Sequence, residues 1–174
     1  MKAFRILIGL GFLMICSAAT QAQQVSVDFD RAADFSKYKT FRFAEGTPAG
    51  NPMIHQRIIS GIEAQLSSKG LRKVDHGADL VVIYHAATDT KVSVNTMGGG
   101  PFGGWRFGPG SATVNRVPVG QLIIDIGDAS AKKFVWRGTA SGTLSSKPEK
   151  NEKALNSALA KLFQDFGNPA AKKK

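Results

Sequence analysis

Residues 80–84 read LVVIY, an uninterrupted apolar run that begins directly after Asp79. The run is too short for a buried helix, and its β-branched residues favour a strand. A strand without alternating polar residues is typical of the interior of a sheet that is covered on both faces. The run therefore predicts a central strand with cover on both sides.

Several shorter segments on both sides of this run predict further strands, because apolar residues alternate with polar ones or recur in short β-rich runs. The last two segments are separated by a turn that begins at Gly127, and they predict an antiparallel hairpin. In chain order the segments are 25–29, 41–43, 92–94, 119–126 and 134–136.

Two segments have the period of an amphipathic helix. Pro52 suits the first turn of the first helix, and Gly70 suits a left-handed residue just past its end. Gly167 and Pro169 terminate the second helix. The apolar stripes are Ile54, Ile58, Ile62 and Leu66 in the first helix and Leu155, Leu159, Leu162 and Phe166 in the second.

The order β-β-α-β-β-β-β-α predicts an α+β fold. Strands that follow one another through short turns favour antiparallel pairing, so we expect an antiparallel or mixed β-sheet with the two helices packed on one face. We expect a single domain over residues 23–168, with a glycine-rich loop at 97–111 and a basic tail at 169–174.

The first residues predict export. Lys2 and Arg5 precede an apolar run over 6–15, and small residues follow up to Ala22. This is the pattern of a secretory signal peptide over 1–22, cut after Ala22, and the apolar run is shorter than the roughly 20 residues that span a bilayer. We expect a periplasmic protein.

An outer-membrane lipoprotein is the alternative. Leu13 stands three residues before Cys16, as in bacterial lipid-attachment sites, but Ile15 stands where such sites carry Gly, Ala or Ser. The sequence therefore leaves open whether Cys16 carries a lipid or is removed with the signal.

The chain is strongly basic, with a net charge of +10 that becomes +8 when Lys2 and Arg5 leave with the signal. A basic exported protein favours anionic partners such as lipid, lipopolysaccharide or glycan, or else an envelope protein. Export and the lack of a nucleic-acid motif argue against nucleic acid. The alternative is that the excess charge only keeps the protein soluble.

Residues 97–111 read MGGGPFGGWRFGPGS and contain the letter pattern G-x-G-x-x-G at 98–103. A dinucleotide site needs a helix directly after these glycines, and the following GWRFGPG cannot start one. We therefore expect no cofactor and interpret the segment as a loop between two strands, a spacer unless its tip contacts a partner or a membrane. The candidate contact residues are Phe102, Trp105, Arg106 and Phe107.

We find no motif for nucleophilic catalysis, and the three histidines lack metal-site spacing. The sequence therefore predicts neither catalytic nor metal-binding residues and indicates that the protein is not an enzyme. The alternative is a hydrolase whose site uses acids and histidines near strand ends, namely Asp75, His76, Asp79, His85 and Asp89.

Two further groups of residues carry weaker predictions. Asp28 and Asp30 would share one face of an edge strand, where a pair of acids is usually solvated. Phe134 and Trp136 would share a face and pack in the core, with Arg137 pointing outward.

Five spaced segments resemble the bacterial family known as domain of unknown function 4136, over roughly 25–166. They read VDFD at 27–30, DFSKYKTF at 34–41, ADLVV at 78–82, GQLIID at 120–125 and WRG at 136–138. The resemblance implies an exported or lipid-anchored envelope protein with a glycine- and aromatic-rich insertion and no assigned catalytic residues. We therefore expect a non-enzymatic binding or structural module of the cell envelope, either alone or as a subunit of a larger assembly.

Overall fold

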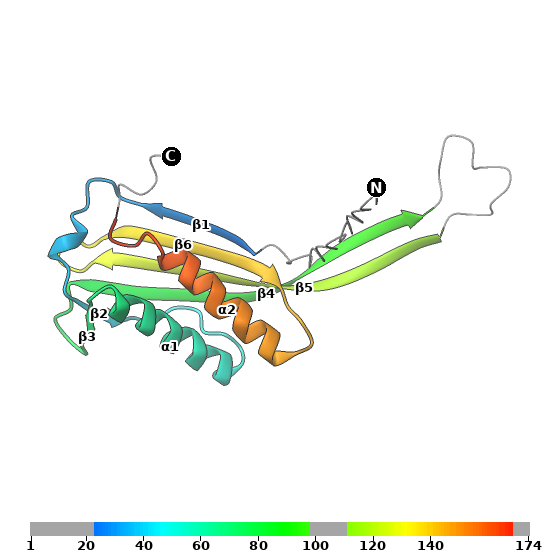
Figure 1. The fold of residues 1–174 in the computed structure, drawn as a ribbon, viewed down its shortest axis with the longest axis horizontal. Coiled ribbons are helices and arrows are strands. Elements are labelled where there is room, and N and C mark those ends of the chain that lie inside the picture. Colours follow the sequence, from blue (N-terminus) through cyan, green and yellow to red (C-terminus); the bar gives the residue numbers. More distant parts are fainter. Residues whose placement is uncertain (1–22, 98–110, 169–174) are drawn as a thin grey trace, which may run out of the picture.

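The computed structural model describes residues 23–97 and 111–168. They form a six-stranded sheet with the strand order β1-β6-β5-β4-β2-β3 (Figure 1). The strands are β1 (Gln24–Phe29), β2 (Thr40–Phe43), β3 (Arg72–Lys73), β4 (Leu80–Met97), β5 (Ser111–Asp128) and β6 (Lys133–Thr143).

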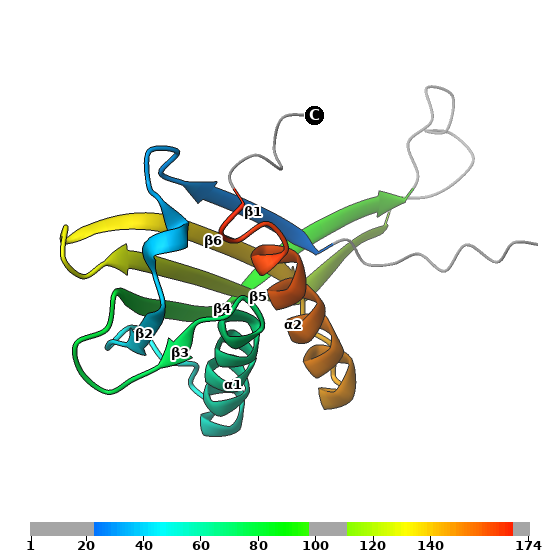
Figure 2. The same cartoon turned by 60° about the vertical axis from the view of Figure 1, so that its left-hand side comes forward.

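The sheet is mixed. The pairs β1·β6, β6·β5 and β5·β4 are antiparallel, whereas β2 runs parallel to both β4 and β3. A short 3-10 helix, η1 (Phe35–Lys37), precedes β2, and the helices α1 (Pro52–Ser68) and α2 (Pro148–Phe163) lie on one face (Figures 1 and 2). The predicted fold class and the order β-β-α-β-β-β-β-α are confirmed, with η1 added. The predicted strands at 80–84 and 92–94 form the single strand β4, and the two-residue β3 was not predicted.

The ends of α1 follow the local sequence. The Asn51 side chain accepts a hydrogen bond from Met53 N at 2.8 Å, which caps the first turn. Gly70 has a φ of +86°, and its N–H and that of Leu71 donate to the carbonyls of Ser67 and Leu66 at 2.9 and 3.2 Å. This is a Schellman C-cap, which requires the left-handed glycine that the sequence places there.

The core lies between the helices and the sheet. Ile58, Ile62 and Leu66 of α1 are buried as predicted, but Ile54 is 42% exposed. In α2 the stripe includes Phe163, which is fully buried and which the predicted stripe omitted. Gly61 allows the two helices to approach closely, since a Cβ at this position would lie 2.5 Å from Leu159 Cδ1.

The expected cover on both faces of the central strand was wrong. Leu80, Val82 and Tyr84 of β4 are buried under the helices, but Val81 and Ile83 on the opposite face are only half-buried. Both helices pack on one face (Figure 2), and among the described residues no second layer covers the other.

A β-bulge also changes which residues of β6 face the core. The register shifts between Ile126 and Gly127, so that Gly127 pairs with Phe134 and Ile126 with Trp136. The extra residue, Val135, is buried beside Trp136, whereas Phe134 is 59% exposed. The prediction that Phe134 and Trp136 share a face was therefore wrong, although Trp136 packs in the core and Arg137 points outward as expected.

Candidate functional site

A two-stranded ribbon projects from the sheet (Figure 1). β4 pairs with β2 only as far as Val82, and β6 pairs with β5 only from Val119 onward. Beyond this point β4 and β5 continue to pair with each other up to Met97 and Ser111. With a rise of about 3.3 Å per residue, the ribbon extends roughly 25 Å from the body.

The ribbon holds the ends of the glycine-rich segment together, since Met97 and Ser111 are direct partners in the ladder. The predicted contact residues, Phe102, Trp105, Arg106 and Phe107, lie outside the described residues. The described residues show that both ends of the glycine-rich segment, Met97 and Ser111, lie at the outer end of the ribbon. The predicted strand at 119–126 is longer than expected, because β5 begins at Ser111.

The ribbon exposes apolar and basic side chains. Val92 and Val114 are 60% and 55% exposed. Lys91 and Arg116 are exposed as well, and Arg116 lies directly opposite Val92 in the ladder. An isolated two-stranded ribbon is marginally stable in water, and this one leaves two valines exposed to solvent.

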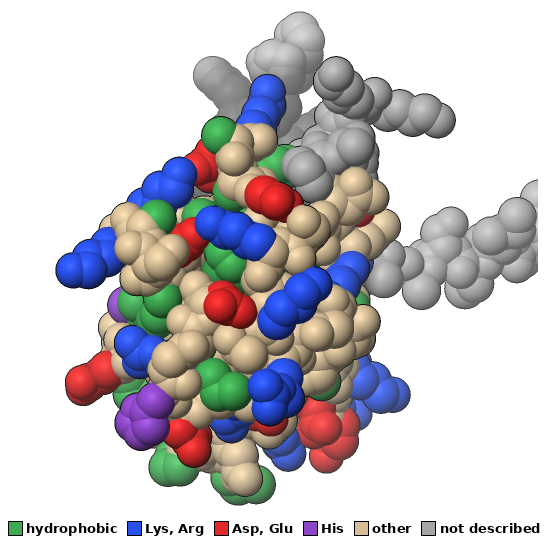
Figure 3. Space-filling model, turned by 90° about the vertical axis from the view of Figure 1, so that its left-hand side faces the viewer, with side chains coloured by type: hydrophobic (Ala, Val, Ile, Leu, Met, Phe, Trp, Pro, Cys, Tyr) green, Lys and Arg blue, Asp and Glu red, His purple; other side chains and the backbone are tan. Residues whose placement is uncertain are grey.

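The net charge is unevenly distributed along the chain. All 13 Asp and Glu residues lie within the described residues, but six of the 23 Lys and Arg residues lie outside them. On the end of the molecule that carries η1 and β3, basic and acidic side chains are interspersed (Figure 3). The body is therefore only mildly basic, and much of the predicted excess belongs to Lys2, Arg5, Arg106, Lys172, Lys173 and Lys174.

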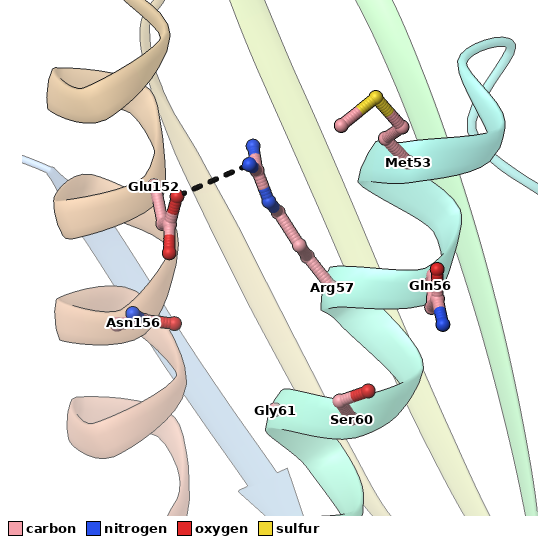
Figure 4. Close-up of a pocket in the computed structure, with 7 residues that line it drawn as sticks. All are labelled: Met53, Gln56, Arg57, Ser60, Gly61, Glu152 and Asn156. Atoms are coloured by element: carbon pink, nitrogen blue, oxygen red, sulfur yellow. Dashed lines mark ion pairs between the residues drawn. The ribbon is translucent and has the colours of Figure 1, made fainter.

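A shallow hollow of about 430 Å³ lies between the N-terminal halves of α1 and α2 (Figure 4). Arg57 of α1 and Glu152 of α2 reach toward each other across it, with Nη2 and Oε2 3.3 Å apart. Both side chains are well exposed, so this ion pair contributes little to stability. The other lining residues are Met53, Gln56, Ser60, Gly61 and Asn156.

The acids and histidines of the hydrolase hypothesis do not come together around one point. Asp79 Oδ2 accepts hydrogen bonds from the N–H groups of Lys39 and Thr40 and from Thr40 Oγ1, at 2.8 to 2.9 Å. The backbone N–H of Lys39 is the main reason that the pKa of Asp79 is lowered. Through these hydrogen bonds Asp79 holds the start of β2 beside β4. Asp75 and His76 are exposed in the turn that precedes Asp79.

The remaining histidines have structural neighbours. His85 Nδ1 lies 2.9 Å from Thr47 Oγ1, where the segment after β2 runs along β4. His55 Nδ1 hydrogen-bonds the hydroxyl of buried Tyr84. Asp89 is exposed and accepts a hydrogen bond from Thr90 N at 2.7 Å. Within residues 23–97 and 111–168, no three His, Cys, Asp or Glu side chains form a group that could hold a metal ion.

Asp28 and Asp30, the two acids near the N-terminus, have different partners. Asp28 lies on the edge strand β1, and its carboxylate accepts a hydrogen bond from Phe29 N at 2.9 Å. Asp30 lies beyond the end of β1 and forms an ion pair with Lys133 at 2.8 Å. The strand ends too early for the two carboxylates to act as a pair on one strand face.

Two buried carboxylates were missed as important residues. Asp128, which is 3% exposed, accepts hydrogen bonds from Lys37 Nζ, Tyr38 Oη, Ser130 N and Oγ, and Ala131 N, at 2.6 to 2.9 Å. The Lys37 ammonium contributes most to holding the pKa of Asp128 far below its usual range. Asp128 thereby ties the β5–β6 turn to η1.

The second carboxylate lies on the open face of the sheet. Asp125, 4% exposed, accepts hydrogen bonds from Arg137 Nε and Nη2 at 2.5 and 2.9 Å. The two residues are direct partners in the β5·β6 ladder. This two-point contact raises the pKa of Arg137 and neutralises its charge, so Arg137 adds little to the basic surface.

Among the residues that the structure describes, no helix is long and apolar enough to cross a membrane.

Comparisons with solved structures show that the fold is known. A DUF4136 family protein from Bacteroides thetaiotaomicron has a TM-score of 0.54 at 15% identity, with 82% of this chain and 95% of that chain covered. The PelC dodecamer from Paraburkholderia phytofirmans has a TM-score of 0.51 at 16% identity, with 81% and 95% covered. At these identities the likeness concerns the fold.

A PDZ domain protein from Parabacteroides distasonis has a TM-score of 0.54 at 17% identity and covers 86% of this chain. The aligned region spans only 38% of that longer protein. A search of curated proteins finds no match. Residues 25–166 match the model of the family described as "Domain of unknown function (DUF4136)", so the chain belongs to the DUF4136 family.

Proposed function

We propose that this protein is a non-enzymatic module of the cell envelope that holds the aromatic segment 98–110 away from its body and against an anionic envelope component. The observation that carries the proposal is the β4–β5 ribbon. β4 and β5 stay paired with each other well beyond the residues that pair with β2 and β6, and the ribbon ends at Met97 and Ser111. A paired ladder of this kind brings both ends of the segment to the same distance from the body, which a single unpaired linker would not do.

The side chains of the ribbon and its loop support an anionic ligand. Lys91 and Arg116 are exposed on the arms, and Arg106 lies between aromatic residues in the segment they carry. Phe102, Trp105 and Phe107 suit the interface of a membrane, where aromatic rings sit at the level of the headgroups and a guanidinium pairs with phosphate. The anionic groups of phospholipid or lipopolysaccharide fit this combination.

Three acids of the described residues support a non-enzymatic role. Asp79, Asp125 and Asp128 each accept several hydrogen bonds that join elements of the fold. A general acid or base needs a carboxylate within reach of a substrate, and these are already occupied by structural partners.

Binding of the mature protein, residues 23–174, to phosphatidylglycerol vesicles tests the proposal, with phosphatidylcholine vesicles as the neutral control. We expect the double variant Trp105→Ala, Arg106→Ala to bind anionic vesicles at least tenfold more weakly. A variant without Lys172, Lys173 and Lys174 controls for bulk charge and should retain more of the binding. Equal binding by the double variant and the parent protein would show that Trp105 and Arg106 do not contact the vesicles and would contradict the proposed role of the segment.

Lipopolysaccharide micelles in the same assay distinguish the two anionic sources. If the protein binds neither vesicles nor lipopolysaccharide, the ligand is not an anionic lipid. Capture of a specific envelope protein that depends on Trp105 would then replace the lipid with a protein partner.

We propose the periplasm as the location. N-terminal sequencing of the exported protein tests this, with Gln23 as the expected first residue. A mature chain that begins at Cys16 and carries a lipid would instead make the protein a lipoprotein.

A further inference from the structure

One edge of β4 lacks a neighbouring strand along the ribbon. On this side β2 pairs as far as Val82, and then Thr47 continues the contact. Thr47 N donates to Tyr84 O at 3.1 Å, and Ala86 N donates to Thr47 O at 2.9 Å. Among the described residues, no backbone group bonds to this edge beyond Ala86.

The outward-facing backbone groups of this edge belong to alternate residues. Val82 and Tyr84 turn their carbonyls to that side, and Ala86 turns its N–H there. Because direction alternates along a strand, the N–H and C=O groups of Thr88, Thr90 and Val92 face the same way. The N–H of Thr90 agrees with this direction, since it donates to the carboxylate of Asp89 at 2.7 Å and not to a strand.

The side chains beside these groups suit pairing with an identical strand. Thr88, Thr90 and Val92 are β-branched, and Val92 is 60% exposed. Between them, Asp89 and Lys91 are exposed on the other face of the strand with opposite charges. A two-fold axis through Thr90 would place each Asp89 opposite the Lys91 of a second copy.

We propose that the β4 edge centred on Thr90 is a self-association site at which two copies of this chain pair in antiparallel orientation. Thr88 lies opposite Val92 of the second copy, and Thr90 lies opposite its own equivalent. The pairing forms about six backbone hydrogen bonds and joins the two sheets into one. The Asp89 carboxylate exchanges its contact with Thr90 N for the ammonium of Lys91 of the second copy.

This site does not involve residues 98–110, so its test is independent of the test of the proposed envelope ligand. A strand edge that a protein protects against pairing usually carries a proline, a bulge or charged side chains, lysine above all. The part of the β4 edge from Thr88 to Val92 has no proline and no bulge, and its two charged side chains, Asp89 and Lys91, have opposite signs. Its two charges complement each other across the proposed axis.

Charge reversal in sedimentation-equilibrium experiments on residues 23–174 tests the site. In Asp89→Lys two lysines face each other across the axis, and in Lys91→Asp two aspartates do. We expect each variant to weaken the dimer at least about tenfold, because two cross-strand pairs become repulsive. The double variant restores both pairs, and an equimolar mixture of the two single variants forms a heterodimer.

Two controls separate this site from other effects. Lys161→Asp reverses a charge on the exposed face of α2, and it leaves the dimer unchanged. Slower hydrogen exchange at the amides of residues 88–92 in the dimer locates the contact on the β4 edge.

Three results would overturn the proposal. The first is a parent protein that is monomeric at all concentrations, and the second is a mixture of the two single variants that associates no better than either alone. The third is stronger association of Asp89→Ala, which would show that Asp89 protects the edge from pairing. Circular dichroism on each variant confirms that these exposed substitutions leave the fold intact.

Discussion

The indole ring of Trp136 on β6 stacks on the ring of Phe163 near the end of α2, with ring centroids 4.9 Å apart and an interplanar angle of 25°. Phe166 meets the same indole edge-on at 5.6 Å. The indole lies over Gly138, so a side chain at that position would collide with it. Trp136 and Gly138 therefore work together to attach α2 to the sheet.

We expect Trp136→Ala to lower the free energy of unfolding by about 3 to 5 kcal/mol, because it opens a large cavity under α2. Phe134→Ala is the matched control on the same strand, since Phe134 is 59% exposed and its loss should cost less than about 0.5 kcal/mol. Denaturation in urea measures both changes. Similar losses in the two variants would contradict the bulge that separates these residues.

Gly138→Ala is expected to destabilise the protein by about 1 to 3 kcal/mol, since the added methyl group forces the indole or Leu162 out of place. The same urea experiment measures the change. Gly142→Ala on the same strand is the control, because a Cβ there meets Gln23 Cγ at an ordinary 3.5 Å. A stable Gly138→Ala variant would mean that the indole does not lie over the glycine.

The contact between Gly61 and Leu159 predicts a coupled pair. Gly61→Val should cost about 1 to 3 kcal/mol, because the new side chain enters the space of Leu159 Cδ1. Leu159→Ala alone should cost about 2 to 5 kcal/mol. In the double variant the valine fills part of the space that the leucine leaves, so the combined loss is smaller than the sum. Strict additivity in urea denaturation would show that the helices do not meet here.

Asp128 predicts how stability depends on pH. Its pKa is lowered in the folded protein, chiefly by Lys37, so its contribution to stability is complete above the unfolded pKa of about 4 and is lost as the pH falls further. We expect the free energy of unfolding to fall less steeply between pH 5 and pH 3 in Asp128→Asn than in the parent protein. Asp75→Asn, in an exposed turn, is the control. An unchanged slope in Asp128→Asn would remove Asp128 as a source of acid sensitivity.

Local patterns in the sequence were enough to predict the elements that bury one face. The stripe at Ile58, Ile62 and Leu66 and the glycine at the end of α1 specify a capped amphipathic helix. The alternation in β1 and the hairpin after Gly127 are likewise local. Each of these features depends on residues within a few positions of one another, which is the range that periodicity reports.

The features that the sequence did not reveal depend on distant residues or on an unburied surface. Asp128 is satisfied by Lys37 and Tyr38, some ninety positions away in the chain. Pro118 has no N–H to donate, yet it lies inside β5: its carbonyl accepts a hydrogen bond from Leu144 N at 2.8 Å, and its pairing with Thr90 keeps the ladder to β4 continuous. The ribbon side chains at 90–92 and 114–116 are all exposed, and binary patterning therefore carries little information about the length of the ribbon.

The ribbon is expected to be dispensable for the stability of the body. Lys91 and Val117 are direct partners, so residues 92–116 can be replaced by Asn-Gly, which closes a two-residue turn between them. The described ribbon residues pair with each other, and Val92 and Val114 bury little surface against the body. We expect the midpoint of thermal unfolding to change by less than about 2 °C. Circular dichroism measures this midpoint. A loss of several degrees would show that the removed residues also stabilise the sheet. If the midpoint is unchanged, any loss of vesicle binding in this variant belongs to the ribbon and its loop and not to an unfolded body.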